Sequence, residues 1–521
     1  MVSGSGTATT LKRAAGALFR SAGADAEALW AGFGPARAPA VGLHRFDVGR
    51  TGERRRIHLR IEADRSGTLF VDAMDVIHLN RTAAEIAHAA LAGEAAGRIA
   101  ARLTRQAEAG KRDAVRGDVA RICEMVAQLS ASATACVTCA MPEVERAAVF
   151  SRRATAPYKA DVAVTYGCSN HCAHCYNEPD RLDMASLTAD AWKEVLDRLH
   201  AVGVPHVIFT GGEATLHPEL PELIAHAESH GQITGLNTNG RRLAQASYVE
   251  RLEAAGLNHV QVTLASSRRK VHNAVNGADA FDQTVRGTER AVASRLHVIT
   301  NTTLSRANAD HAEEIIDYLY ALGIRTFAMN GMIYSGGGFA DADAIREEEL
   351  PTLLLRVRDH AAERGMRFLW YTPTEYCRMS PVELEIGAKR CNAGEYSICI
   401  EPNGDVLPCQ SYYVAAGNIL RDPWEQIWRS ELFRSFRDRE EDPVLGQLPE
   451  KCWECPELPV CGGGCRIERE ARDGTRVADG GGCGSCGSVS REEGVPVGFV
   501  PTGQLIDTAI RSRGRTADEQ A

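Results

Sequence analysis

The stretch CSNHCAHCY, from Cys168 to Tyr176, places three cysteines four and then three residues apart, with no fourth cysteine beside them. It follows the apolar run VAVTY, which predicts that the three thiols lie on a loop at the end of a buried strand. Such a loop can wrap its thiolates around one inorganic cluster, because iron–sulfur cubes are held by cysteine sulfur. A missing fourth ligand would leave one iron open for a substrate or cofactor.

Zinc is the alternative metal for this loop. Structural zinc takes four protein ligands, normally from separated CxxC pairs, and His171 or His174 could supply the fourth. The spacing alone therefore favours an iron–sulfur cluster and leaves zinc open.

Composition and charge narrow the class of protein. The chain has 521 residues and a net charge of −9, which argues against a nucleic-acid partner. It shows no signal-peptide region and no apolar run as long as a membrane span, so we expect a cytoplasmic protein with no membrane partner. Thiols stay reduced in that compartment. Its sixteen cysteines therefore indicate metal or redox chemistry rather than disulfides.

Strands and helices alternate regularly from Val162 onward. The apolar runs VAVTY, VIFT, ITGLNT, VQVTL, VITNT and TFAMN are separated by helical segments, one of which has Thr188 as N-cap and Gly203 as stop. This alternation predicts a parallel sheet with right-handed crossovers. Six units are too few to close an eight-stranded barrel. Residues 155–345 are therefore expected to form a partial (β/α)6 barrel, with ligands at the carboxyl ends of its strands.

Residues 1–140 predict a separate, winged-helix-like α+β domain. Short runs at 57–61, 69–71 and 76–80 are typical of strands in a small sheet. Three amphipathic helices follow, the second at 98–107 and the third beginning with Asp118 as its N-cap.

The C-terminal part is rich in cysteine. Residues 346–376 predict a linker helix and strand, 377–490 a cysteine-rich domain, and 491–521 a tail. Twelve residues separate Cys391 from Gly404, and four residues separate Gly404 from Cys409. A second run begins with a CxxC pair, and five, three and seventeen residues then separate the cysteines that follow. Its members are Cys452, Cys455, Cys461, Cys465 and Cys483. A zinc ribbon is the alternative interpretation of this pattern.

The CxxxCxxC spacing with an aromatic residue after it resembles the motif of the radical SAM superfamily, and TGGEAT after the second strand supplies that family's GGE. The resemblance implies a 4Fe–4S cluster on Cys168, Cys172 and Cys175 that binds S-adenosylmethionine and yields a 5′-deoxyadenosyl radical. The glycines would let the backbone approach the methionine amino group. The fourth strand lacks the commoner Ser-x-Asp, so the ribose contact could fall on Thr263 or Ser266. The implied cofactor contacts are Tyr176, Gly211, Gly212, Glu213, Asn237, Asn239, Thr263, Ser266, Asn301 and Thr303.

The later cysteines resemble the seven-cysteine SPASM module, which carries two auxiliary 4Fe–4S clusters and would bring the total to three. The resemblance implies that Cys391, Cys409 and Cys465 hold the first auxiliary cluster, with Cys377 preferred to Cys399 as its fourth ligand. The second would be held by Cys452, Cys455, Cys461 and Cys483.

The first domain resembles the peptide-recognition element of the pyrroloquinoline-quinone pathway's small chaperone, on the segment HLNRTAAEIAHAALAG at 78–93. The resemblance implies that the leader of a precursor peptide adds a strand to the small sheet. The whole chain is then similar to that pathway's radical SAM enzyme. It would be a maturase that crosslinks or otherwise modifies a ribosomal peptide, with a flavodoxin- or ferredoxin-type reductant as second partner.

Two other functions stay open. One is oxidation or decarboxylation of a small molecule such as heme, and the other is a non-enzymatic peptide-binding protein scaffolded by zinc. Formylglycine formation is disfavoured, because Gln410 stands where the sulfatase-maturing group has its catalytic Asp. The sequence identifies no catalytic acid or base.

Overall fold

The computed structural model describes residues 38–48, 55–71, 75–131, 150, 153–339, 341–474 and 507–510. The predicted cluster ligand Cys483 and the predicted tail, apart from residues 507–510, lie outside this part of the chain. Among the described residues, no helix combines the length and the hydrophobicity needed to cross a bilayer.

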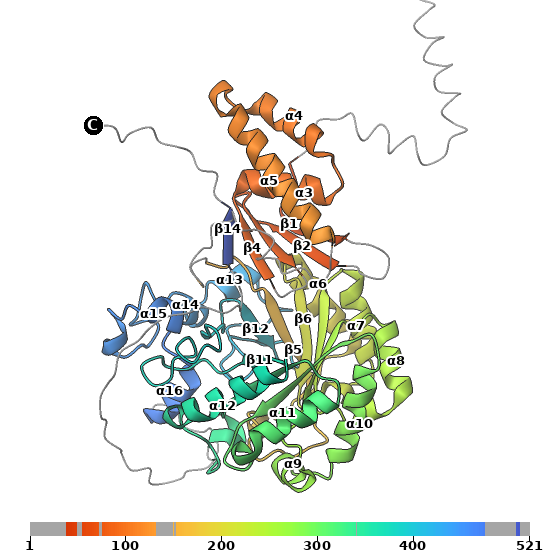
Figure 1. The fold of residues 1–521 in the computed structure, drawn as a ribbon, viewed down its shortest axis with the longest axis vertical. Coiled ribbons are helices and arrows are strands. Elements are labelled where there is room, and N and C mark those ends of the chain that lie inside the picture. The colour runs from red at the N-terminus through yellow and green to blue at the C-terminus, as the bar shows by residue number, and fades with distance from the viewer. Residues whose placement is uncertain are drawn as a thin grey trace, which may run out of the picture. The chain divides into compact units, whose positions relative to one another are not determined.

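The largest sheet has nine strands in the order β11-β10-β9-β8-β7-β6-β5-β12-β13 (Figure 1). Its six central strands are parallel neighbours, which confirms the predicted partial barrel. They are β5 (Lys159–Thr165), β6 (His206–Gly211), β7 (Ile233–Thr238), β8 (His259–Thr263), β9 (His297–Thr303) and β10 (Thr326–Asn330). At one edge β11 (Arg367–Trp370) adds in parallel. At the other edge β12 (Ser397–Ile400) runs parallel to β5 and pairs with the antiparallel β13 (Val406–Leu407).

Helices connect the parallel strands, and α6 (Ala189–Val202) illustrates how the sequence specifies them. Thr188 caps its start by accepting a hydrogen bond from the Ala191 N–H, and Gly203 ends it with a φ of 93°. Trp192 and Val195 are buried on one face against the strands. The other connecting helices are α7 (Leu220–Ser229), α8 (Ala246–Ala254), α9 (Arg269–Asn276), α10 (Phe281–Val292), α11 (Ala312–Ala321) and α12 (Leu350–Glu363).

The N-terminal residues form an antiparallel sheet of β1 (Gly42–Val48), β2 (Arg55–Ile61), β3 (Gly67–Val71) and β4 (Asp75–Leu79). The helices α3 (Arg81–Leu91), α4 (Ala96–Gln106) and α5 (Arg112–Ala131) pack against it around one apolar core. The strand β1 was not predicted from the sequence; it is an edge strand whose side chains are only half-buried or exposed. The predicted N-cap at Asp118 is wrong, because Asp118 lies inside α5 rather than at its start.

A fifth strand joins this small sheet from the far end of the chain. Residues 507–510 form β14 (Asp507–Ile510), which pairs in parallel with β4 and gives the order β1-β2-β3-β4-β14 (Figure 1). The edge of β4 therefore holds an added segment of extended backbone.

The small sheet also contacts the end of α7. The Arg56 guanidinium donates to both carboxylate oxygens of Glu228, at 2.8 and 2.5 Å. His58 Nε2 lies 2.8 Å from the carbonyl oxygen of Gly231, which follows that helix. The residues after α7 are thus hydrogen-bonded to β2.

The C-terminal part packs short helices around the cysteines. They are α13 (Trp424–Trp428), α14 (Glu431–Arg437), α15 (Leu458–Cys461) and α16 (Arg466–Arg472). Because β12 and β13 belong to the large sheet, this part is directly continuous with the barrel.

Candidate active site

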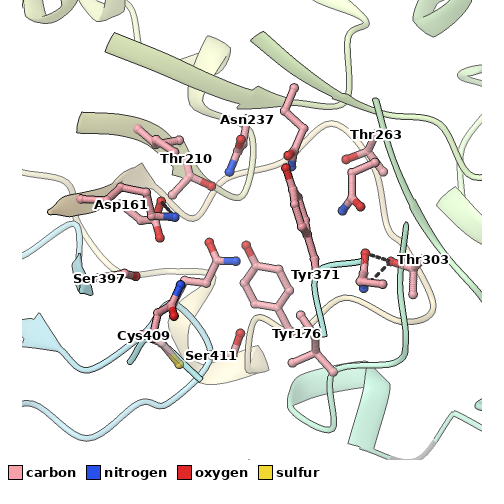
Figure 2. Close-up of a pocket in the computed structure, with 18 of the residues that line it drawn as sticks. Asp161, Tyr176, Thr210, Asn237, Thr263, Thr303, Tyr371, Ser397, Cys409 and Ser411 are labelled. Atoms are coloured by element: carbon pink, nitrogen blue, oxygen red, sulfur yellow. Dashed lines mark hydrogen bonds and ion pairs between the residues drawn. The ribbon is translucent and has the colours of Figure 1, made fainter. Parts of the chain in front are cut away.

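The large sheet borders a cavity of about 1420 Å³, which is lined by the strands β5 to β11 and by the C-terminal part. Figure 2 shows side chains from both sources pointing into it around Tyr176. Asp161 and Thr210 come from β5 and β6, and Cys409 and Ser411 come from the C-terminal part. The cavity exceeds the volume of about 300–1,000 Å³ that is usual for small-molecule sites.

The three cysteines after β5 all line this cavity. The loop that carries them is held by backbone hydrogen bonds from outside it. The His171 N–H donates to Asn276 O at 2.9 Å, the Ala173 N–H to Val275 O at 3.1 Å, and the Gly337 N–H to Cys175 O at 2.7 Å. The residues that follow β10 and those at the end of α9 therefore fix the loop on two sides.

These thiols are close enough to affect one another's ionisation. Burial, together with the negative charges of Cys175 and Cys168, raises the pKa of Cys172 to about 12. Three thiolates at this place therefore need a positive centre, and a coordinating metal deprotonates its thiol ligands. The donor set fits an iron–sulfur cluster held by cysteine sulfur.

Gly211 and Gly212 are required for packing against the loop before the cysteines. A Cβ on Gly211 would lie 2.0 Å from the Thr165 carbonyl oxygen, and one on Gly212 would lie 2.2 Å from the Tyr166 carbonyl oxygen. Gly211 also has a φ of 134°, which side-chain-bearing residues rarely adopt. The missing Cβ atoms thus serve the approach of β6 to β5, a reason that the sequence analysis did not give.

Glu213 is buried and binds protein groups with both carboxylate oxygens. Oε1 accepts from the Thr215 N–H, the Thr215 hydroxyl and the Thr238 hydroxyl, at 3.1, 2.6 and 2.7 Å. Oε2 accepts from the Asn239 N–H at 2.7 Å. Glu213 is not among the residues that line the cavity. The structure therefore makes it a brace between the ends of β6 and β7, whereas the sequence analysis expected a cofactor contact.

The predicted polar residues at the strand ends divide into two groups. Asn237, Asn239, Thr263, Asn301 and Thr303 line the cavity. Ser266 does not, because its buried hydroxyl is bonded to His311 Nε2 at 2.7 Å and accepts from the Arg268 N–H. Of the two alternatives for the fourth strand, only Thr263 faces the cavity.

Three buried amide oxygens of the cavity wall have no hydrogen-bond partner. They are Oδ1 of Asn301, Oδ1 of Asn392 and Oε1 of Gln410. Buried polar groups are normally paired, so these oxygens fit a bound ligand that supplies donors. Amino and hydroxyl groups such as those of S-adenosylmethionine are donors of this kind.

Tyr176 is packed between the barrel and the C-terminal part. Its carbonyl oxygen accepts from the Tyr413 hydroxyl at 3.4 Å, and that hydroxyl also bonds Asn177 Oδ1 at 3.0 Å. Burial raises the pKa of Tyr176 well above its usual value, so the phenol stays protonated.

Cys391, Cys409 and Cys465 form a second group of thiols on the cavity wall. Burial and the charge of Cys391 raise the pKa of Cys409 to about 12. Burial, with the charges of Cys391 and Cys409, also raises the pKa of Cys465. The structure therefore brings together three cysteines that are far apart in the sequence.

Cys377 lies with the other predicted auxiliary set. Its Sγ accepts a hydrogen bond from Lys451 Nζ at 3.3 Å, next to Cys452. The N–H of the preceding residue, Tyr376, donates to Cys461 Sγ at 3.4 Å. The sequence analysis preferred Cys377 as a ligand of the first auxiliary set, but these contacts place it beside cysteines of the second. The rival candidate, Cys399, is fully buried in β12 and does not line the cavity.

Two basic side chains near the cysteine loop and the cavity were not predicted from the sequence. Arg241 donates to Asn170 Oδ1 at 2.9 Å and so supports the cysteine loop. Lys389 lines the cavity, and burial with the charge of Lys159 lowers its pKa to about 8. Neither stands in a local motif that could have identified it.

Comparison with known families agrees with this geometry. Residues 162–319 match the radical SAM superfamily, and residues 391–456 match the SPASM iron–sulfur cluster-binding domain. This chain is a radical SAM enzyme with a SPASM domain. It uses S-adenosylmethionine with a 4Fe–4S cluster, and its SPASM domain binds further iron–sulfur clusters.

Two curated relatives resemble this radical SAM/SPASM enzyme over similar lengths. A PqqA peptide cyclase from Streptomyces rochei is 28% identical over 63% of this chain and 90% of its own length. An AdoMet-dependent heme synthase from Methanosarcina barkeri is 27% identical over 60% of this chain and 91% of its own length. Streptococcus suis SuiB, solved with its precursor peptide SuiA, shares the fold with a TM-score of 0.56 and 18% identity. That match covers 82% of this chain and 96% of SuiB.

Proposed function

We propose that this radical SAM/SPASM enzyme modifies a ribosomally synthesised precursor peptide, whose leader binds the N-terminal sheet. The observation that carries the proposal is the pairing of β14 with β4. It means that the β4 edge is geometrically able to take an added extended segment. Strand addition to a sheet edge is a general mode of peptide binding, in which main-chain hydrogen bonds supply the affinity.

The leader would use the same edge as Asp507–Ile510 and would have to displace that segment. Each of the four β4 residues from Val76 to Leu79 has a partner residue in β14. A leader strand paired over the same length would replace those partners one for one. The proposal therefore includes competition between the leader and the chain's own strand β14.

The cavity and the cofactor that it would hold also agree with the modification of a peptide. When bound, the cluster and S-adenosylmethionine supply a 5′-deoxyadenosyl radical able to abstract a hydrogen atom. The chain's own residues bind and orient this cofactor, with Asn301 and Thr263 at the strand ends and Tyr176 beside them. At about 1420 Å³, the cavity has room for a cofactor together with a side chain of a peptide.

We assign the cluster ligands from the grouping of the thiols. Cys168, Cys172 and Cys175 would hold the cluster that binds S-adenosylmethionine. The first auxiliary cluster would use Cys391, Cys409 and Cys465. The second would use Cys452, Cys455 and Cys461, with Cys377 beside them as a ligand that could stand in for the predicted Cys483. A flavodoxin- or ferredoxin-type protein of the cytoplasm would supply the electron.

Heme oxidation or decarboxylation is the second candidate. The heme synthase and the peptide cyclase are nearly equally similar to this chain, at 27% identity over 60% of it and 28% over 63%. The barrel and the SPASM domain therefore do not separate the two functions. The N-terminal sheet with its added strand favours the peptide.

Co-expression of the enzyme with a precursor peptide encoded beside its gene tests the proposal by mass spectrometry. We expect a mass change in the peptide with wild-type enzyme. Ile77→Pro disturbs β4 and should abolish the mass change while cleavage of S-adenosylmethionine persists. The matched control is Phe46→Pro in β1, the opposite edge strand, which should leave the modification intact. Undiminished modification by Ile77→Pro would overturn the leader site, and an unchanged peptide mass with wild-type enzyme would restore the small-molecule alternative.

A further inference from the structure

Two imidazoles and one carboxylate converge on the solvent side of the helices α6 and α7. His226 and His230 lie one turn apart at the end of α7, and Asp197 lies on α6. Both Nε2 atoms are 2.6 Å from the same oxygen, Oδ1 of Asp197. About a quarter of each imidazole is exposed, at 26% and 28%, so an ion can reach the group from solvent.

We propose that Asp197, His226 and His230 bind a divalent transition-metal ion such as Zn²⁺. Their ligand atoms all lie within 4.8 Å of one another. Zinc takes imidazole nitrogen and carboxylate oxygen at about 2.0–2.2 Å, and three protein ligands leave its fourth position to water. Magnesium and calcium prefer oxygen ligands, so two imidazoles select against them. The ion would replace the two protons that now bridge the imidazoles and the carboxylate.

The ring of His230 is already oriented. It stacks on the His200 ring with 4.7 Å between centroids and 13° between planes, and its edge meets His226 at 5.0 Å. His200 Nδ1 is itself buried without a hydrogen-bond partner. A packed imidazole loses little freedom when it ligates a metal, which favours binding.

A second place in the barrel has the same geometry but different chemistry. Asp317 on α11 accepts with one oxygen from His360 Nε2 at 2.8 Å and from Arg364 Nε at 2.7 Å. The two donors again lie four residues apart, on α12 and directly after it. A guanidinium keeps its charge and offers no lone pair to a metal. This site can form only ion pairs, and it provides an internal control for the first.

Metal binding would act on the contact between α7 and the small sheet. Glu228, which binds Arg56, lies between the two histidines, and Gly231, which binds His58, follows His230 directly. An ion that ties this turn to α6 would hold both anchoring groups in place. We therefore assign the site a structural role, independent of the reaction in the cavity.

Zinc titration of the reconstituted holoenzyme, carrying no histidine tag, tests the site by calorimetry and thermal unfolding. The double variant His226→Gln/His230→Gln keeps amide donors for Asp197 but removes the imidazoles. We expect wild-type protein to bind one more equivalent of Zn²⁺ than this variant. The affinity for this additional equivalent should be at least about 100-fold higher than the affinity of any site that the variant retains. Zinc should raise the unfolding temperature of wild-type protein and of the control His360→Ala, but not that of the double variant.

Equal stoichiometry and affinity in wild-type and double-variant protein would overturn the proposal. So would a loss of the extra equivalent in His360→Ala. If the double variant does not fold, the single variant His226→Gln replaces it. It should lower the affinity of that one equivalent at least about tenfold, and an unchanged affinity would equally refute the site.

Discussion

Replacing Glu213 by Gln exchanges one carboxylate oxygen for an NH₂ group inside a pocket made of four donors. The carboxylate accepts from Thr215 twice, from the Thr238 hydroxyl and from the Asn239 N–H. The new amide would oppose at least one of these donors and leave it unpaired, which costs about 1–3 kcal/mol. The remaining hydrogen bonds would no longer involve a charged acceptor and would lose about half their strength. A neutral Gln is easier to bury than a carboxylate, which offsets part of this loss.

We therefore expect Glu213→Gln to lower the free energy of unfolding of the barrel by about 2–4 kcal/mol. For a domain of this size that corresponds to a fall of about 5–15 °C in Tm. Circular dichroism of the cluster-free protein measures it without any cofactor. The matched control is Glu219→Gln, in the same connection between β6 and α7, whose carboxylate is 45% exposed and lies 3.6 Å from His217. Its Tm should fall by little, because exposed ion pairs contribute about 0–1 kcal/mol.

The decisive comparison is between stability and cofactor affinity. If Glu213 is a brace, cluster-free Glu213→Gln melts early, and the holoenzyme binds S-adenosylmethionine nearly normally at temperatures where it is folded. An unchanged Tm together with much weaker binding, measured by equilibrium dialysis, would refute this reasoning. Glu213 would then be a direct cofactor contact, as the motif alone suggested.

Three other outcomes can be tested directly. Changing Cys168, Cys172 and Cys175 together to Ala should remove about four irons per chain and abolish formation of 5′-deoxyadenosine; continued formation would contradict the ligand assignment. Cys377→Ala should alter the EPR spectrum of the second auxiliary cluster alone, and a change confined to the first would return Cys377 to that set. Deleting residues 507–521 should tighten leader binding about fivefold, or about 1 kcal/mol, in fluorescence anisotropy, since the competing strand is gone. An unchanged Kd would show that β14 and the leader do not share an edge.

Local patterns predicted the elements whose determinants are close together in the chain. Thr188 and Gly203 bound α6 as expected, because a cap and a stop act on the turn beside them. The same locality explains the error at Asp118. It is a good capping residue, yet α5 already starts at Arg112 after a short 3₁₀ turn. β1 was missed because an edge strand that is only partly buried carries a weak hydrophobic pattern.

Roles that depend on distant contacts could not be predicted in this way. Glu213 belongs to a recognisable motif, but its partner Thr238 lies at the end of the next strand. Cys377 precedes Cys391 in the sequence, which suggested one shared cluster. The chain instead folds Cys377 against Lys451. Asn301 could be chosen as a strand-end residue, but its unpaired oxygen is visible only when the cavity is formed.

The sequence by itself determined the class of chemistry and the order of the parts. Cysteine spacing decides which thiols can reach one cluster from a single loop, and the alternation of apolar runs decides that the strands are parallel. Only the tertiary structure decided which thiols from different loops lie together, which motif residues face the cavity, and which strand pairs with the edge of β4. β14 reaches β4, and His230 reaches Asp197, through packing between segments that are remote in the chain. Such contacts depend on the relative placement of whole elements, which no local pattern of residues encodes.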